Sequence, residues 1–399
     1  MPSTLSTQKR ACNDWTSLPF NVVGSLGERL LAADDIDCYM AFRAVCEDWR
    51  SATKDYPEKA DYTDPTCFQP GKWALLDQQD DLVTLVNVDT GRFLCKSIPI
   101  LRKYFFVGAT GGGLILLRES MEPHHARVLN PFTGSIAYFK VSIPVVGLMA
   151  IAVTTGPLMI FVSTEIGDIM WVDQNSECFK RFSLTYPNQP TCITSFTSNV
   201  YATDRLGSIF SMIVADVAAG EQKAPSALTS SAIPSLDTGH LALIRSGRYY
   251  LVESGGDLLL VTRPSHMIPV HPVVHRVDIK EKILEPVINI GNHAIFVSPI
   301  RCLSVDADKF QGIKGGCVYF VEPILTRGNY VPSTMITFSI ADGWQGLHMF
   351  EQGTLEGCFR PLTLAQVFAD YCRTTHHSEL HQMISSEWDW NFSDNEPDE

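Results

Sequence analysis

The chain has 399 residues, of which 45% are apolar and 19% are charged, as is ordinary for a globular protein with a sizeable core. Its formal net charge is −13, and Lys and Arg are not clustered, which argues against binding to nucleic acid or to an anionic membrane surface. The 11 cysteines form no Cys-x-x-Cys pair, and no apolar signal-peptide run opens the chain. Reduced thiols and a location in the cytoplasm, the nucleus or both are therefore expected.

A first amphipathic helix is predicted within residues 16–35. Leu18, Val22, Leu26 and Leu30 recur every four residues, so they share one face of a helix. Thr16 or Ser17 can cap the free backbone N–H groups, and Pro19 suits the first turn, where its missing donor costs nothing.

A second helix is predicted from the acidic pair Asp34-Asp35, and its apolar face continues into AFRAVCEDWRSA, residues 41–52. Trp49-Arg50 belongs to the end of this helix or to a short third one. Two or three helices within about 40 residues bury little apolar surface by themselves. They therefore need a partner, either the rest of this chain or another protein.

This N-terminal pattern resembles the F-box, the motif that docks onto the Skp-type adaptor of a cullin–RING ubiquitin ligase. The resemblance spans residues 14–54 and combines Leu18-Pro19, Arg29-Leu30, Asp35 and the stretch from Phe42 to Arg50. It implies an adaptor-facing surface formed or supported by Leu18, Pro19, Val22, Val23, Leu26, Leu30, Leu31, Val45, Cys46, Trp49 and Arg50. Phe20-Asn21 departs from the family, in which an acidic residue commonly follows Leu-Pro.

From about residue 70 to residue 372 the sequence predicts short strands. Apolar runs recur at intervals of about 40–50 residues, and several pairs flank turn residues, as in VESGGDLLLV (252–261), LNPFTGSIAYF (129–139) and LVNVDTGRFLC (85–95). The uncharged run at 143–162 contains TTGP, which favours two buried strands over a membrane helix. The expected fold is mainly β: a β-propeller-like domain of six or seven blades behind the helices, with a β-sandwich pair as the alternative.

Several of these strings, including YLVESGGDLLLVTR (250–263) and FQGIKGGCVYF (310–320), resemble the kelch-like propeller domain of plant F-box proteins. The resemblance implies a substrate receptor whose propeller recruits a target protein. The segment LTLAQVFADYCR (362–373) is predicted to form a short helix packed on this domain. The acidic segment at 373–399 is predicted to be a disordered tail.

No local motif for catalysis or metal binding is found. The strings G-x-S-x-G and H-E-x-x-H do not occur, and GATGGGLILL (108–117) continues as a strand instead of a phosphate-binding helix. His376, His377 and His381 lack the further ligands that zinc requires. No cofactor, metal or catalytic residue is therefore predicted, and the chain is expected not to be an enzyme.

The predicted function is substrate recognition within a cullin–RING ubiquitin ligase. Residues 14–54 would dock the Skp-type adaptor, and the propeller would bind an unidentified target protein. The alternative is a free-standing propeller that acts as an interaction scaffold, whose N-terminal helices only cap its own core.

Overall fold

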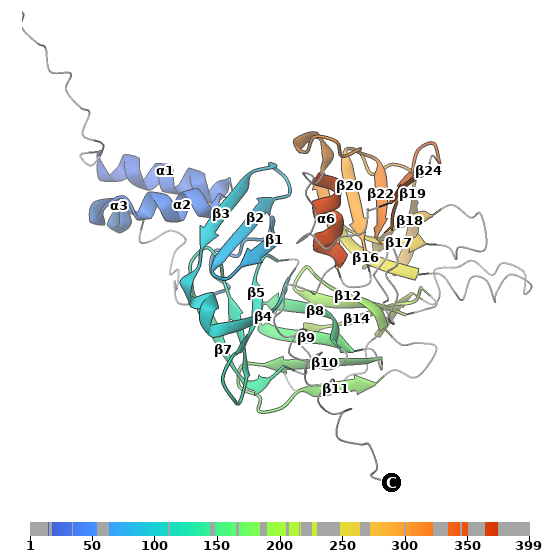
Figure 1. Cartoon of the computed structure of the whole chain (residues 1–399), viewed down its shortest axis with the longest axis horizontal. Helices are drawn as coiled ribbons and strands as arrows, with labels where there is room; N and C mark the ends of the chain where they lie inside the picture. Colours follow the sequence, from blue (N-terminus) through green and yellow to red (C-terminus); the bar gives the residue numbers. More distant parts are fainter. Residues whose placement is uncertain are drawn as a thin grey trace, which may run out of the picture.

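The structure is a computed structural model of the whole chain (Figure 1). It describes residues 15, 18–33, 35–53, 64–110, 112–143, 148–164, 167–183, 190–204, 207–214, 216, 226–229, 248–263, 272–298, 301–321, 334–343, 345–349 and 364–373. The predicted acidic tail and the histidines of THHSELH lie outside the described residues.

Three helices precede the first strand: α1 (Phe20–Ala32), α2 (Ile36–Arg43) and α3 (Glu47–Ala52). The predicted helices are confirmed, and Trp49-Arg50 lies in a separate third helix. The expected hydroxyl cap on α1 is not its N-cap: that position is Pro19, which makes no side-chain hydrogen bond there. The acidic cap on α2 is confirmed, because the Asp35 carboxylate accepts a 3.2 Å hydrogen bond from the Cys38 backbone N–H.

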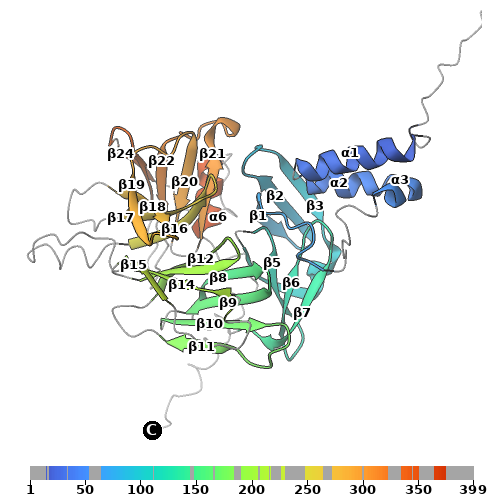
Figure 2. The same cartoon turned by 180° about the vertical axis from the view of Figure 1, so that it is seen from behind.

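The described strands form six sheets around a common axis, so the structure is a six-bladed β-propeller (Figures 1 and 2). Blades 1 to 3 contain β1 (Trp73–Gln79), β2 (Leu82–Asn87), β3 (Phe93–Ser97), β4 (Tyr104–Ala109), β5 (Ile115–Glu119), β6 (His125–Leu129), β7 (Ile136–Ser142), β8 (Leu148–Thr155), β9 (Leu158–Thr164), β10 (Asp168–Asp173) and β11 (Lys180–Ser183). Blades 4 and 5 contain β12 (Pro190–Phe196), β13 (Asn199–Asp204), β14 (Ile209–Met212), β15 (Ser226–Thr229), β16 (Arg248–Ser254), β17 (Asp257–Arg263), β18 (Val273–Asp278) and β19 (Ile283–Val287). Blade 6 contains β20 (His293–Val297), β21 (Cys302–Asp306), β22 (Cys317–Val321), β23 (Thr334–Ser339) and β24 (Gln345–Met349). Of the two blade numbers predicted, six is the one observed.

Blades 2 to 5 are antiparallel meanders in chain order, with β4, β8, β12 and β16 next to the axis. The predicted hairpins are confirmed: β16 pairs with β17 from Arg248↔Arg263 to Ser254↔Asp257. Its turn is Gly255-Gly256, and both residues have positive φ values, +60° and +85°. The uncharged run at 143–162 contributes β8 and β9, and none of the helices in the described residues has the length and apolar character of a membrane span.

Blade 6 departs from the meander. Its order is β21-β20-β22-β23-β24, and β20 pairs with β22 in parallel. A short 3-10 helix, η3 (Ala307–Lys309), follows the inner strand β21, and another, η2 (Pro99–Lys103), links blade 1 to blade 2.

The helix α6 (Leu364–Arg373) fills the junction between the last blade and the first, and confirms the predicted C-terminal helix. Figures 1 and 2 both show α6 between β1 and β20. Phe368 is fully buried in one core cluster with Ala74 and Val86 of blade 1 and Phe296 of blade 6. The Phe368 ring lies 5.5 Å from that of Phe296 and 5.0 Å, edge to face, from that of Phe310. The closure of the ring therefore depends on a helix.

The substitution Phe368→Ala tests this closure. Truncation of a fully buried phenylalanine is expected to lower the free energy of unfolding by about 3–5 kcal/mol. Phe93→Ala, at a site where the side chain is 45% exposed, is the matched control and is expected to cost less than half as much. Chemical denaturation measures both, and equal losses would contradict a closing role for α6.

A second stability test concerns the contact between blades 4 and 5. Gly207 has φ +77°, and a Cβ atom there would lie 2.5 Å from the buried ring of Tyr249. Gly134 has almost the same φ, +74°, with nothing within 4 Å of the Cβ position. Gly134→Ala is therefore expected to lower the free energy of unfolding by the cost of backbone strain alone, about 1–2 kcal/mol. Gly207→Ala also forces the new methyl group against Tyr249. It is expected to lower the free energy of unfolding by about 1–3 kcal/mol more than Gly134→Ala, as measured by denaturant titration.

Candidate functional site

The three N-terminal helices pack on the outer side of blade 1 through α2. Ile36 and Tyr39 are buried in a core cluster with Phe68 and Trp73, and the rings of Tyr39 and Phe68 lie 5.4 Å apart. Leu30 and Leu31 of α1 are half-buried against the same cluster. The helices are thus fixed to the propeller at one end of α1 and along α2.

Arg92, beside the turn that joins β2 and β3, clamps the start of α2. Its guanidinium forms ion pairs with Asp35 at 2.9 Å and with Asp37 at 2.6 Å, and it donates a 3.3 Å hydrogen bond to the Cys38 thiol. Burial opposes the charged form of Arg92, but Cys38 and the two carboxylates outweigh this effect, and the net result raises its pKa. The guanidinium also lies over the Trp73 ring at 5.8 Å.

A second small core holds the helices to one another. Val23, Trp49 and Ala52 are buried, with Leu18, Phe42 and Cys46 packed against them. Thr53 ends the module: its carbonyl accepts hydrogen bonds from the Tyr39 hydroxyl at 3.1 Å and from Arg43 at 2.8 Å. Gly27 allows α1 to approach closely, because a Cβ there would lie 2.7 Å from the Thr53 side chain.

The predicted adaptor-facing residues fall into three groups. Val23 and Trp49 are buried inside the helical module, with Leu18 and Cys46 half-buried beside them. Leu30 and Leu31 turn toward blade 1. The remaining predicted residues are exposed, and they are Pro19, Val22, Leu26, Val45 and Arg50.

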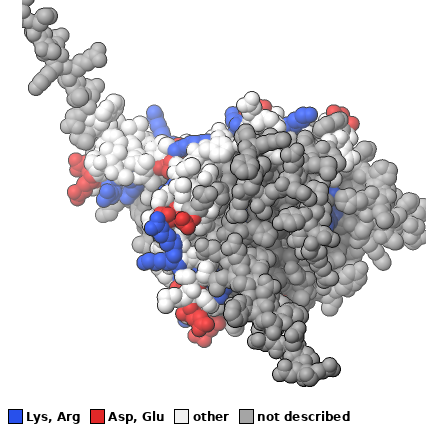
Figure 3. Space-filling model, in the orientation of Figure 1, with Lys and Arg blue, Asp and Glu red and all other residues white. Residues whose placement is uncertain are grey.

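One face of α1 is left uncovered by the described part of the chain. Pro19, Val22 and Leu26 follow at offsets of three and four, and form what we term the apolar stripe. Val22 is 40% and Leu26 37% exposed. Phe20 at the start of the helix is 62% exposed. In Figure 3 the surface over the helices is mostly uncharged, with acidic and basic side chains at its border.

A second candidate site is the cavity on the propeller axis, with a volume of about 990 Å³. All six blades and Tyr371 of α6 contribute to its wall. Blades 2 to 5 line it with the later residues of their inner strands. Blade 1 lines it with the start of β1 and the residues after β2, and blade 6 lines it with β21. Its mouth includes Asp89, which forms a 3.0 Å ion pair with Lys72, and also Glu253 and Asp306.

The opposite end of the cavity, its floor, is formed by Cys192, Leu251, Arg301 and Cys302. The Cys192 thiol lies 4.0 Å from the Leu251 carbonyl and shares a hydrogen bond with the Cys302 thiol, which joins the inner strands of the consecutive blades 4, 5 and 6. That hydrogen bond and burial raise the pKa of Cys302, which keeps its thiol neutral. Among the described residues, no group of His, Cys, Asp or Glu is arranged to hold a metal ion.

No local motif in the sequence indicated this cavity, because its wall collects short segments from every blade. The only available signal is the regular spacing of the strands, which predicts a propeller and hence an axial channel. Arg301 and the two thiols in its wall are not part of any sequence motif.

Residues 85–340 match the KIB1-4 beta-propeller family, which is more than half of the chain. The chain belongs to this family. The match includes strands from β3 to β23 and lies outside the N-terminal helices and α6. No curated protein matches the chain.

Solved propeller-like structures resemble the chain at low identity. BamB from Moraxella catarrhalis has 10% identity and a TM-score of 0.31, over 70% of this chain and 79% of that one. The β-propeller domain of Cps50 (Swd1) from Myceliophteria thermophila has 12% identity and a TM-score of 0.35, over 69% and 84%. Similarity at this level does not indicate a function for the chain.

The substitution Arg92→Ala tests the clamp on α2. It leaves Asp35 and Asp37 next to each other without the cation that they share. The free energy of unfolding is therefore expected to fall by about 1–3 kcal/mol. Amide hydrogen exchange in α2 is expected to accelerate about tenfold or more, because local opening becomes easier. Arg102→Ala removes a more exposed ion pair with Asp81 and is expected to leave exchange in α2 unchanged. Unchanged α2 exchange in Arg92→Ala would refute the clamp.

Proposed function

We propose that this protein is the substrate receptor of a cullin–RING ubiquitin ligase, and that its N-terminal helices dock a Skp-type adaptor. The observation that carries the proposal is the apolar stripe of Pro19, Val22 and Leu26, which the propeller leaves uncovered. Val45 in the turn between α2 and α3 adds a further side chain that is 52% exposed.

The stripe is unusual for helices that serve only as a cap. Such helices gain stability by turning their apolar residues inward, and their outward positions are ordinarily polar. Here α1 directs Val23 and Leu30 inward, yet keeps apolar side chains on its outer face as well. Contiguous exposed apolar surface marks an interaction site, and interface energy concentrates in a few such anchors.

Phe20 bears on the departure from the family pattern. An acidic residue is common directly after Leu-Pro, whereas this chain has a phenylalanine that is 62% exposed. The exchange removes a charge from the start of α1 and adds apolar area beside the stripe. The adaptor surface that this chain fits is therefore more apolar at that position than the one that the common motif meets.

The propeller supplies the second half of the proposed role. Its fold is consistent with protein interaction, and its rigid connection to α2 through Arg92 and the Tyr39 cluster holds both halves in one orientation. In this proposal other subunits transfer ubiquitin. The receptor contributes by raising the local concentration of the target beside them.

The double substitution Val22→Glu with Leu26→Glu tests adaptor docking. Two charges within an apolar interface are expected to weaken binding to a purified Skp-type adaptor by about 30-fold or more, which corresponds to a loss of about 2 kcal/mol. Glutamate retains helix propensity, so the unfolding midpoint is expected to change little. Isothermal titration calorimetry measures the affinity.

Val273→Glu with Leu82→Glu is the matched control, since these residues are of the same types and are 41% and 47% exposed on the propeller. The control is expected to bind the adaptor as the wild type does. The proposal is wrong if the wild-type protein does not bind the adaptor.

The second candidate function, a free-standing interaction propeller, rests on the packing of Ile36 and Tyr39 against blade 1. This packing shows that the helices do cover part of the core. Removal of the helices therefore destabilises the protein under either function, and only the adaptor titration separates the two.

A further inference from the structure

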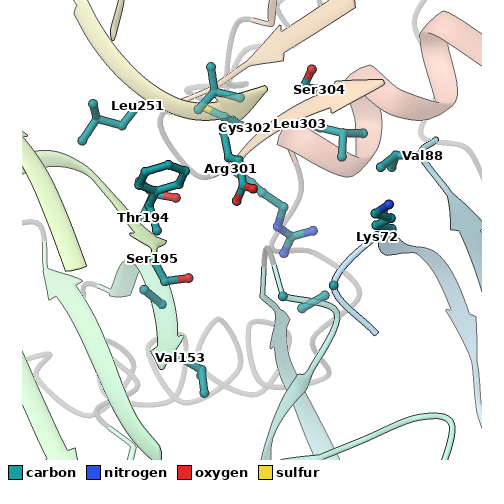
Figure 4. A pocket seen from close by; sticks show the side chains of 18 of the residues that line it. Lys72, Val88, Val153, Thr194, Ser195, Leu251, Arg301, Cys302, Leu303 and Ser304 are labelled. Atoms are coloured by element: carbon teal, nitrogen blue, oxygen red, sulfur yellow. The ribbon is translucent and has the colours of Figure 1, made fainter. Parts of the chain in front are cut away.

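The floor of the axial cavity holds a cation without an acidic partner. Arg301 donates a 3.2 Å hydrogen bond to the Tyr371 carbonyl, and its guanidinium lies over the Tyr371 ring at 4.4 Å. Within the described residues it forms no ion pair. Figure 4 shows its side chain extending into the open space of the pocket, between Ser195 of blade 4 and Lys72 of blade 1.

The side chains around Arg301 in the cavity wall include uncharged polar groups. The nearby thiol of Cys302 is protonated, as described above, and hydroxyl groups of Thr194, Ser195 and Ser304 line the same wall. A Cβ atom on Gly108 would lie 2.7 Å from Ile151 and 3.8 Å from the Arg301 guanidinium. The glycine therefore leaves room for the Ile151 side chain of blade 3 next to the cation.

The mouth has the opposite charge. Glu253 lines the cavity and forms no ion pair within the described residues, and burial, together with the nearby Asp89, raises its pKa. Lys72 is already paired with Asp89. The cavity thus presents Arg301 at its floor and the carboxylate of Glu253 at its mouth, and neither forms an ion pair within the described residues.

We propose that the axial cavity binds the carboxyl terminus of a polypeptide, with the terminal carboxylate on Arg301 and the preceding residues extending toward Glu253. Arginine binds a carboxylate through two parallel N–H donors, a geometry that suits a chain end.

The volume favours a polypeptide over a small acid. About 990 Å³ is at the upper limit of pockets that enclose drug-sized ligands, about 300–1,000 Å³, and so accommodates several residues. The hydroxyl groups on the wall can pair with peptide N–H and C=O groups. Glu253 favours a ligand with a Lys or Arg several residues before its carboxylate.

This inference defines the class of target for the proposed receptor, and in that sense it rests on the proposed function. Its test uses the full-length protein without any adaptor, so the two can fail independently. Randomised heptapeptides are displayed in two libraries, one with a free terminal carboxylate and one with a carboxamide. Enriched sequences are then synthesised in both forms, and their affinities are measured by fluorescence anisotropy.

Free acids are expected to bind at least about 30-fold more tightly than their amides, because an amide offers the Arg301 guanidinium no negative charge to pair with. Arg301→Gln is expected to remove this difference, and Arg301→Lys to restore it in part. Arg102→Gln, which replaces a surface arginine, is the control and is expected to change nothing. Glu253→Gln is expected to reduce enrichment of Lys and Arg upstream of the terminus.

The comparison of acid with amide on the wild-type protein keeps the test valid if Arg301 variants fail to fold. Equal affinity of the two forms, or the absence of an enriched sequence from both libraries, would overturn the proposal. Succinate or benzoate that binds as tightly as the best peptide would also overturn it, since the ligand would then be a small acid.

Discussion

A ring of twisted sheets covers the inner faces of all its blades only if the last blade meets the first. In this propeller α6 completes that contact: it packs between β1 and β20, and Phe368 joins the apolar residues of both blades in one core. The blades also meet directly, since the Asp306 N–H donates a 3.1 Å hydrogen bond to the Val88 carbonyl. The helix also places Tyr371 beside Arg301, which fixes the guanidinium on the axis. Closure of the ring and the charge of its cavity therefore depend on the same ten-residue element.

The two candidate sites have different physical origins. The apolar stripe arises from a single helix whose other faces are already committed to the module core and to blade 1, so it is a local property of residues 19–26. The axial cavity arises from the whole ring, because every blade contributes a short segment to its wall. A substitution in the stripe is thus expected to alter one interaction, whereas many substitutions across the ring can alter the cavity through packing.

Local features of the fold could be predicted from the sequence where neighbouring residues determine them. The apolar period of α1, the Asp35 cap and the Gly255-Gly256 turn each depend on a few consecutive side chains, and the structure confirms them. The number of blades could not be fixed, because repeats without a constant motif leave the period uncertain. The parallel pairing of β20 with β22 and the position of α6 depend on contacts between distant residues, which periodicity does not report. Similarly, the spacing of apolar residues in α1 could not predict that Leu30 and Leu31 face blade 1 while Val22 and Leu26 face outward.

The position of α6 also has a consequence for synthesis of the chain. The inner residues of blade 1, such as Ala74 and Val86, pack in the same core as Phe368, which lies almost three hundred residues later. A ribosome makes about 5–20 residues per second, so this apolar surface waits for tens of seconds before its partner emerges. Contacts between Tyr39 and Phe68 are close in sequence and can form at once. Blade 1 is thus the first blade to be made and the last to be completed, and during that interval it is the part of the nascent protein most in need of a chaperone.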